Sequence, residues 1–281
     1  MKLATLRVDG ATRVARIDLE HSTAVLLAAA DVGGLLADPD WRTIAAGEGE
    51  SVPLEGIDYA PLVPRPDKIV CVGLNYRSHI AEMGHDLPSY PTLFAKYSAA
   101  LVGAHDDIIL PAVSQKVDWE CELAIIIGAA VRHADLDAAA AAIAGYSILN
   151  DVSARDWQNR TSQFLQGKTF ERSTPLGPWL VTSDEPDGTP GRKQRISCEV
   201  DGEVMQDSTT DDLMFDCLSI VSYISTMMTL QPGDVIATGT PSGVGAGRSP
   251  QRFLEDGEVV ISRITGLGEL RNRCVREVLS G

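Results

Sequence analysis

Apolar side chains first alternate and then cluster over the N-terminal part of the chain. The runs LATLRV and VARIDLE alternate apolar and polar residues around the turn sequence DGATR, so they predict a β-hairpin. Residues 22–38 (STAVLLAAADVGGLLAD) have apolar side chains at helical spacing, and Ser22 or Thr23 would cap this helix. The proline-rich stretch 61–68 predicts a linker. We therefore expect a small α+β N-terminal domain over residues 1–64.

The rest of the chain, residues 65–281, shows mainly strand patterns. The runs KIVCVG and CELAIIIG are almost continuously apolar, which is typical of buried strands. Alternating runs on both sides of Asp201-Gly202 predict a second hairpin. The run DVIA is a further strand that breaks into the glycine-rich loop 237–245 (ATGTPSGVG), and residues 257–275 contain the last two predicted strands.

Two helices are predicted in the same half of the chain. Asp135 or Asp137 would cap an alanine-rich helix that ends at Gly145, after which GYSILND returns as a strand. Residues 209–230 have apolar side chains at helical spacing and acids in the first turn. Because strands outnumber long helices, the pattern predicts a mixed α+β, β-rich fold with its main domain over residues 65–281.

Composition and charge exclude several classes of partner. The chain has 281 residues, 44% of them hydrophobic, and a formal net charge of −15. An acidic surface repels phosphate backbones and anionic headgroups, so we expect neither nucleic acid nor membrane as a partner. The five cysteines are widely spaced without a CxxC motif, and the N-terminus lacks a secretory pattern. Reduced thiols and a cytoplasmic location are therefore expected.

The segment VDWECELAIIIG places two acids at the mouth of a buried strand. On a strand Glu120 and Glu122 share one face, whereas Cys121 points to the other, towards the core. Asp151 ends the strand GYSILND and could add a third carboxylate. A hard cation such as Mg²⁺ or Mn²⁺ would neutralise such a set. The alternatives are a solvated strand face, and an Asp151 that caps the following segment VSARDWQ.

Polar residues near Asp151 could act on developing negative charge. If VSARDWQNR begins a helical turn, Arg155 and Gln158 project to the same side as Asp151. Lys168 lies after Gly167 and could bring a further positive charge. Each of these residues on its own is more often a solvated surface side chain.

A histidine and an acid three residues apart form a candidate base. On a helical turn His79 and Glu82 would meet, and Glu82 could orient the imidazole. His85 is a competing base without an acid at that spacing. Glycine and prolines in the segment 79–91 favour a mobile lid. The loop 237–245 allows close backbone approach to a small anion, but the chain lacks P-loop, GxGxxG and GxSxG patterns at the required places.

Seven separated motifs resemble the fumarylacetoacetate hydrolase family. They are, in chain order, GLNYRSHIAEMG, VDWECELAIIIG, NDVSARDWQ, QGKTFE, PLGPW, LQPGDVIATGTPSGVG and GLGELRN. The resemblance covers residues 65–278, whereas residues 1–64 are only loosely similar to the small N-terminal domain of longer bacterial members. It implies a β-roll catalytic domain, usually in a homodimer. Glu171 stands where many relatives have aspartate, and we expect little effect of this difference on metal binding.

The resemblance also implies roles for individual residues. Glu120, Glu122 and Asp151 match metal ligands for Mg²⁺ or Mn²⁺, with Ca²⁺ as a further possibility. His79 and Glu82 match the catalytic dyad on the lid. The residues that match oxyanion, carbanion or substrate contacts are Arg155, Gln158, Lys168, Tyr76, Gly239 and Thr240.

The implied activity is metal-dependent hydrolysis of a C–C bond in an acylpyruvate, a 2,4-dioxo acid such as fumarylpyruvate. Water activated by His79 would attack the 4-carbonyl, and pyruvate would leave as its enolate. The same site suits keto–enol or double-bond isomerisation, as of 2-hydroxyhepta-2,4-diene-1,7-dioate, and decarboxylation of oxaloacetate. A protein that only binds a metal and a metabolite is the non-enzymatic alternative. In every case the expected ligand is a small 2-oxo or 2,4-dioxo acid.

Overall fold

The computed structural model describes residues 1–189 and 191–279, and its strands pair into three sheets within these ranges. The strands are β1 (Lys2–Val8), β2 (Ala11–Asp18), β3 (Thr23–Leu26), β4 (Glu50–Pro53), β5 (Asp58–Tyr59), β6 (Ile69–Gly73), β7 (Thr92–Lys96), β8 (Leu101–Val102), β9 (Ile108–Leu110), β10 (Val117–Asp118), β11 (Cys121–Ile127), β12 (Ile143–Asn150), β13 (Ser153–Ala154), β14 (Thr174–Thr182), β15 (Arg195–Val200), β16 (Glu203–Thr209), β17 (Val235–Ala237), β18 (Val259–Ile264) and β19 (Gly268–Arg276).

Helices are fewer than strands. The α-helices are α1 (Val32–Leu36), α2 (Trp41–Ala46), α3 (Arg77–Glu82), α4 (Leu136–Ala142), α5 (Arg155–Gln158), α6 (Leu165–Lys168) and α7 (Cys217–Met227), and the 3₁₀ turns are η1 (Ser98–Ala100), η2 (Pro186–Gly188), η3 (Thr210–Asp212) and η4 (Gly245–Gly247). The prediction of a β-rich mixed α+β fold is therefore confirmed. No helix in the described ranges has the length and apolarity needed to cross a membrane.

The large sheet runs through the whole molecule in the order β4-β3-β2-β1-β14-β12-β11-β17-β6-β7. Strand β11 lies inside it between β12 and β17, and all seven of its residues are buried. Its side chains alternate between two cores: Leu123 and Ile125 belong to one, and Ala124 and Ile126 to the other. Cys121 lies in the first core, so the prediction that it points away from Glu122 is confirmed.

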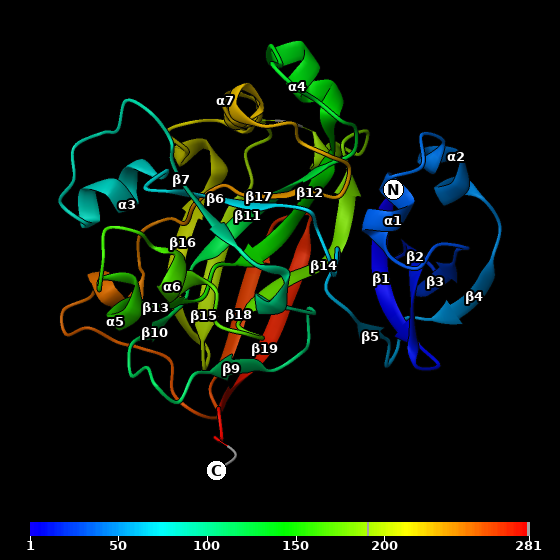
Figure 1. The fold of residues 1–281 in the computed structure, drawn as a ribbon. Helices are drawn as coiled ribbons and strands as arrows, with labels where there is room; N and C mark the ends of the chain where they lie inside the picture. Colours follow the sequence, from blue (N-terminus) through cyan, green and yellow to red (C-terminus); the bar gives the residue numbers. More distant parts are fainter. Residues whose placement is uncertain (190, 280–281) are drawn as a thin grey trace.

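The N-terminal strands extend this sheet instead of standing apart from it. Figure 1 shows β1 to β4 with α1 and α2 at one side of the molecule, next to β14. Strand β1 pairs antiparallel with β14, Lys2 opposite Val181. A boundary after residue 64 stays a prediction. The hairpin around Asp9-Gly10 is confirmed by the β1–β2 pairing.

The prediction of one helix over residues 22–38 is wrong. Residues Thr23–Leu26 form β3, which pairs with β2, and α1 begins only after Asp31, whose side chain accepts a hydrogen bond from the Gly34 N–H. The alanine-rich helix is confirmed as α4 with Asp135 as its cap, but it ends at Ala142 and not at Gly145. There the chain joins β12 directly, because pairing with β11 provides its hydrogen bonds.

A second sheet, in the order β16-β15-β18-β19-β9, packs behind the strands that carry the acidic residues. The hairpin at Asp201-Gly202 and the two last strands are confirmed. Within the large sheet, the start of β11 and the end of β12 lie side by side, with Cys121 opposite Asn150. This register brings two distant parts of the sequence to one point.

Candidate active site

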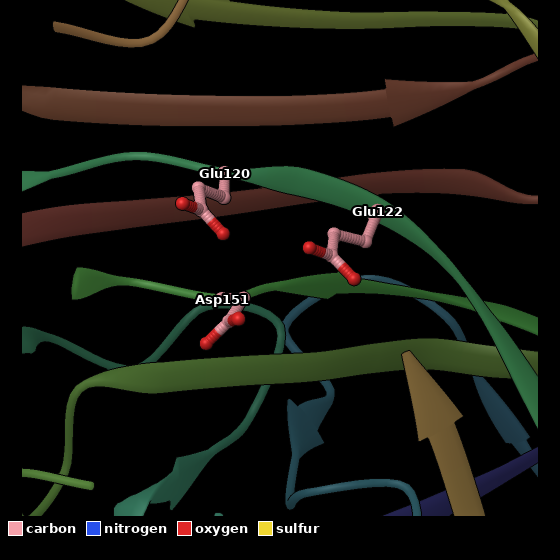
Figure 2. A group of neighbouring side chains, drawn as sticks. All are labelled: Glu120, Glu122 and Asp151. Carbon is pink, nitrogen blue, oxygen red and sulfur yellow. The ribbon is translucent and has the colours of Figure 1, made fainter. Parts of the chain in front are cut away.

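Three buried carboxylates meet where β11 begins and β12 ends. Glu120 immediately precedes β11, Glu122 lies in it, and Asp151 immediately follows β12. One oxygen of each lies within 4.8 Å of the other two. Their exposed fractions are 6%, 2% and 0%. Figure 2 shows the three carboxylates turned toward one another, so the triad (Glu120, Glu122, Asp151) is an assembled site and not a solvated strand face.

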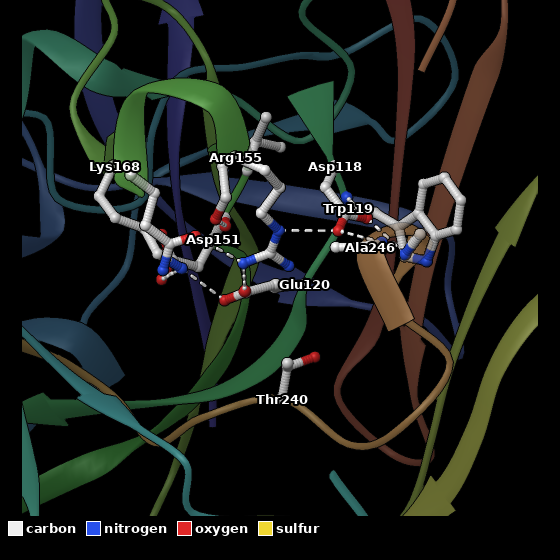
Figure 3. A network of polar contacts seen from close by, with 12 residues as sticks. Asp118, Trp119, Glu120, Asp151, Arg155, Lys168, Thr240 and Ala246 are labelled. Carbon is white, nitrogen blue, oxygen red and sulfur yellow. Dashed lines mark hydrogen bonds and ion pairs between the residues drawn. The ribbon is translucent and has the colours of Figure 1, made fainter. Parts of the chain in front are cut away.

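Three buried cations surround one side of the triad. Lys168 Nζ lies 2.6 Å from Glu120 Oε2 and 2.8 Å from Asp151 Oδ2. Lys96 Nζ, on β7, lies 2.6 Å from Asp151 Oδ1. Arg155 Nη1 lies 2.6 Å from Glu120 Oε1 and its Nε lies 2.8 Å from Asp118 Oδ2. Figure 3 shows this network around Glu120 and Asp151.

The cations are distributed unevenly over the triad. Burial raises the pKa of Glu120, but Lys168 and Arg155 lower it to about 2. For Glu122, burial and then repulsion from Asp151 and Glu120 raise the pKa well above its ordinary value of 4.5. In the described ranges the hydrogen bond found for Glu122 comes from the Gly239 N–H, at 2.7 Å. Glu122 is therefore the carboxylate whose negative charge, once it ionises, no neighbouring cation in the described ranges compensates.

This donor set fits a divalent cation. The buried network contains four carboxylates and three cations, namely Asp118, Glu120, Glu122 and Asp151 with Lys96, Arg155 and Lys168. One negative charge remains, and burying an unpaired charge is costly. Three converging carboxylate oxygens without histidine or cysteine suit a hard ion such as Mg²⁺ or Mn²⁺. Glu120, Glu122 and Asp151 are the residues that would hold it.

The raised pKa of Glu122 predicts how the stability of the metal-free protein depends on pH. The native state keeps a proton on Glu122 that the unfolded chain releases near its ordinary pKa of 4.5. Because the native state then binds more protons, stability falls as pH rises above 4.5 through the raised pKa. Glu122→Gln removes this contribution, so its urea midpoint, measured in EDTA, should fall less between about pH 5 and pH 8. Equal slopes for both proteins would contradict the assignment. Glu120 does not interfere, because its lowered pKa acts below 4.5.

The predicted histidine–acid pair forms on α3. His79 Nδ1 lies 2.9 Å from Glu82 Oε2, and His79 is only 7% exposed. Burial raises the pKa of Glu82, but hydrogen bonds from His79 and from the Gly243 N–H outweigh it and lower this pKa below 4.5. A charged Glu82 keeps the proton of His79 on Nδ1, which leaves Nε2 as the basic nitrogen.

The glycine-rich loop joins the dyad to the triad. Gly239 adopts a φ of +99° and donates to Glu122, and Gly243 adopts +100° and donates to Glu82 Oε1 at 2.8 Å. A Cβ at Gly243 would lie 2.0 Å from the carbonyl oxygen of Met205, so only glycine fits there. Thr240 donates to the Cys121 carbonyl at 3.0 Å. The loop therefore positions backbone donors for both groups.

One cavity of about 320 Å³ is lined by Glu120 and Glu122 of the triad and by His79 of the dyad, whereas Asp151 and Glu82 lie behind its lining. Its lining includes most of the predicted residues, namely His79, Glu120, Glu122, Arg155, Gln158, Lys168 and Thr240, and also His85. Its remaining lining is mainly apolar, with Leu74, Met83, Phe94 and Phe164 among its members. Tyr76 is fully buried and lies apart from this lining, and Gly239 contributes its N–H to Glu122 without lining the cavity itself.

Two members of the network were not singled out from the sequence. Asp118 and Lys96 are fully or almost fully buried, and each pairs with a site residue. Their partners Arg155 and Asp151 lie 37 and 55 residues away along the chain. The available signal was the position of Asp118 in the apolar motif VDWECE, where a solvated aspartate is unexpected.

Comparisons with known proteins identify a family and individual relatives. The family model "Fumarylacetoacetate (FAA) hydrolase C-terminal" matches residues 68–275. The mitochondrial oxaloacetate tautomerase Fahd2a of Rattus norvegicus is 42% identical over 238 residues, which are 83% of this chain and 74% of that protein.

Solved structures resemble most or all of the chain. The 2-hydroxyhepta-2,4-diene-1,7-dioate isomerase of Mycobacterium marinum has a TM-score of 0.81 and 34% identity, covering 99% of this chain and 100% of that one. The fumarylpyruvate hydrolase of Pseudomonas aeruginosa, solved with Mn²⁺ and pyruvate, has a TM-score of 0.69 and 32% identity, covering 83% and 94%. The chain belongs to the fumarylacetoacetate hydrolase family.

Proposed function

We propose that this family member is a divalent-metal-dependent keto–enol tautomerase of a small 2-oxo dicarboxylic acid of the oxaloacetate type. The observation that supports the proposal is the shared cavity, whose lining includes Glu120 and Glu122 of the triad and His79 of the dyad. A cation site and a base in one cavity are what enolisation next to a carbonyl requires.

The proposed reaction needs a bound cation and side chains that position its ligands. A divalent ion held by Glu120, Glu122 and Asp151 would supply Lewis-acid stabilisation of negative charge on the 2-oxo oxygen. Lys168 and Arg155 fix the Glu120 carboxylate between them, at 2.6 Å each. Mainly apolar side chains line the rest of the cavity and exclude water, which strengthens these electrostatic contacts.

His79 moves the proton. With Nδ1 held by Glu82, its Nε2 takes one proton from C3 of the keto acid, and the electron pair of that C–H bond moves into the C2–C3 bond. The protonated imidazole then returns the proton to the 2-oxygen, which completes the enol. The reverse sequence converts enol to keto acid, and His79 ends in its starting state.

The engaged cations favour enolisation over hydrolysis. Hydrolysis at C4 needs several donors aimed at a new oxyanion. Lys168 already donates to two carboxylates, and Arg155 uses Nε and Nη1 for Asp118 and Glu120. Enolisation instead places charge on the 2-oxygen, next to the triad. Relatives named oxaloacetate tautomerases, 42–44% identical to this chain, support the same choice.

Hydrolysis of an acylpyruvate is the second candidate. The His79–Glu82 dyad could activate water, and the similar fumarylpyruvate hydrolase structure supports this reading. Isomerisation of a 2-hydroxydienedioate and decarboxylation of oxaloacetate begin from the same enolate. A homodimer and a cytoplasmic location stay predictions.

The test is a rate measurement on the enol form of oxaloacetate. The protein loaded with Mg²⁺ or Mn²⁺ should speed the loss of enol absorbance over buffer containing the same metal. EDTA should abolish the effect, and added Mn²⁺ should restore it. Coupled detection of pyruvate distinguishes decarboxylation, and acetylpyruvate serves as the hydrolysis substrate. Turnover of acetylpyruvate alone would favour the second candidate, and metal binding without any turnover would favour a binding protein.

A further inference from the structure

The turn η4 packs directly against the acid of the histidine–acid pair. A Cβ on Gly247 would lie 2.8 Å from Cδ, 3.1 Å from Cγ and 3.1 Å from Oε1 of Glu82, and these are its three nearest atoms. Carbon atoms pack best at about 3.5 Å or more, so any side chain on residue 247 would take the space of the Glu82 carboxylate. The backbone of Gly247 lies in a 3₁₀ turn and does not have the positive φ that would itself require glycine.

Glu82 needs this space because its two oxygens have different partners. Oε2 lies 2.9 Å from Nδ1 of His79, and Oε1 accepts from the Gly243 N–H at 2.8 Å. Both distances are ordinary hydrogen-bond lengths, so the carboxylate cannot move far without losing one of these partners. The Glu82 side chain is 19% exposed and residues 83–87 beyond it are exposed, so a displaced carboxylate would move into solvent.

The two ends of α3 are attached to different parts of the protein. At its start, the N–H and Oγ of Ser78 donate to Asp212 Oδ2 at 3.0 and 2.6 Å. At its end, Glu82 joins the helix to the glycine-rich loop through the Gly243 N–H. His79 lies between these attachments in the sequence and lines the cavity, so its position depends on both of them.

Asp118 holds the turn η4 in place. Its exposed fraction is 0%, its Oδ1 accepts from the Gly245 N–H at 2.7 Å, and its Oδ2 accepts from the Ala246 N–H at 2.9 Å. Figure 3 shows Ala246 next to Asp118. The Gly247 N–H donates to the Val244 carbonyl at 3.1 Å. Because charge-assisted bonds fix the turn, a side chain on residue 247 would displace Glu82 and not the turn.

We propose that Gly247 is a positioning residue for proton transfer by His79. The absence of a side chain at this position leaves the space in which Glu82 bridges Nδ1 of His79 and the N–H of Gly243. Residue 247 thereby sets the tautomer and the direction of the imidazole, although Gly247 itself does not line the cavity. The inference rests on the proposed function for the role of His79 as the base. The placement of Glu82 by residue 247 does not depend on which reaction follows.

Gly247→Ala is the direct test, because it adds one methyl group at the point of contact. We expect kcat for oxaloacetate tautomerisation to fall about tenfold or more, the effect of losing a charged hydrogen bond that positions the base. Mn²⁺ affinity and the urea midpoint should stay close to native, since the added methyl group displaces only the end of an exposed side chain. Unchanged kcat would overturn the proposal, and so would unfolding of the variant or an equal loss of Mn²⁺ affinity.

Gly34→Ala is the matched control. Gly34 lies in α1 without a positive φ, and the nearest atom to an added Cβ would be Asp31 Oδ1 at 3.8 Å, an ordinary contact. This variant should keep the native kcat, and a loss equal to that of Gly247→Ala would contradict a specific role of residue 247. Gly243→Ala does not serve, because its Cβ would lie 2.0 Å from the Met205 carbonyl oxygen and would distort the backbone.

A double-mutant cycle tests whether Gly247 acts through Glu82. In Glu82→Ala the side chain that an alanine at position 247 would displace is absent. Adding Gly247→Ala to this variant should therefore lower kcat no further. Additive losses would show that residue 247 acts by another route and would reject the proposal.

The tautomer of His79 provides a readout that needs no turnover. Imidazole ¹⁵N shifts of the Mg²⁺-loaded protein, assigned by comparison with His79→Gln, should place the proton of the neutral ring on Nδ1 in the native protein. In Gly247→Ala they should show a mixture of both tautomers, because the carboxylate that selects one of them has moved. The native pattern in the variant would be evidence against the inference.

These outcomes separate the inference from the proposed function. A change of tautomer in Gly247→Ala, without turnover of oxaloacetate by the native protein, would sustain the role of Gly247 and reject the tautomerase. Turnover by the native protein, with the same kcat and the same tautomer in the variant, would do the reverse.

Discussion

Glu122→Ala should abolish the binding of Mn²⁺ and, with it, all turnover of a 2-oxo acid. Glu122 carries the uncompensated charge of the buried network, because the cations contact Glu120 and Asp151 instead. Removing it leaves three carboxylates and three cations, which balance, so the attraction for a divalent ion is lost together with one ligand. We expect the affinity for Mn²⁺ to fall by more than about a hundredfold. This exceeds the usual effect of losing a side chain that only supports a metal-ligating residue.

Calorimetric titration with Mn²⁺ measures this loss, and thermal unfolding provides a second readout. A ligand at about a hundred times its Kd stabilises the native state by about 2.7 kcal/mol and so raises its Tm. The rise in Tm on addition of Mn²⁺ should be absent from the variant. Glu203→Ala is the matched control, because Glu203 lies at the start of β16 in the second sheet with an exposed side chain, whereas the triad lies at strands of the large sheet. Native Mn²⁺ affinity in Glu122→Ala would remove Glu122 from the site.

A strand could be predicted from the sequence where its own run of residues shows how it is buried. The run CELAIIIG forms β11 because both of its faces are covered, one by each core. The run STAVLLAAA misled the prediction, since alanine and leucine favour helices in isolation. In the structure Thr23–Leu26 pairs with both β2 and β4, and this pairing outweighs local propensity. Gly33 and Gly34, which weaken a helix, leave α1 with only five residues.

The site was predictable where its residues lie close together in the sequence. Glu120 and Glu122 are two apart on one face of a strand, and His79 and Glu82 are three apart on a helix, so local geometry alone brings each pair together. The position of Asp151 depends on the β11–β12 register, in which Cys121 opposes Asn150. Periodicity does not determine that register, so the residues alone left Asp151 as either a third carboxylate or a cap, and the resemblance to a family favoured the ligand.

The contacts of the cations could not be predicted in the same way. Lys168 was expected to face the substrate, but α6 places its ammonium between Glu120 and Asp151. Burial lowers the pKa of Lys168, but the negative charges of Asp151 and Glu120 outweigh burial and raise it, so the ammonium stays charged. Lys96 was not singled out from the sequence, and only the tertiary structure shows its Nζ 2.6 Å from Asp151. Charge balance in a buried network is a property of the assembled fold.

His79→Gln should lower kcat for oxaloacetate tautomerisation by about 10²- to 10⁴-fold, the usual contribution of a positioned acid or base. Glutamine can still donate to Glu82 but cannot carry the proton between C3 and the 2-oxygen. Because His79 contacts none of the triad through a hydrogen bond in the described ranges, Mn²⁺ affinity should be unchanged. The measurement is the rate of enol loss at saturating substrate, with Mn²⁺ binding followed in parallel.

The competing base gives the matched control for this prediction. His85 lines the same cavity, but no acid holds its ring in the described part of the chain, so His85→Gln should lower kcat less than about tenfold. The loss of kcat in Glu82→Gln should lie between the losses in the two histidine variants. This substitution leaves the imidazole of His79 in place but removes the negative charge that keeps the imidazole proton on Nδ1. A large loss in His85→Gln with a small one in His79→Gln would assign proton transfer to His85. Equal loss of tautomerisation and of acetylpyruvate cleavage in His79→Gln would show that one base serves both reactions, and the choice between them would then depend on the donors at C4.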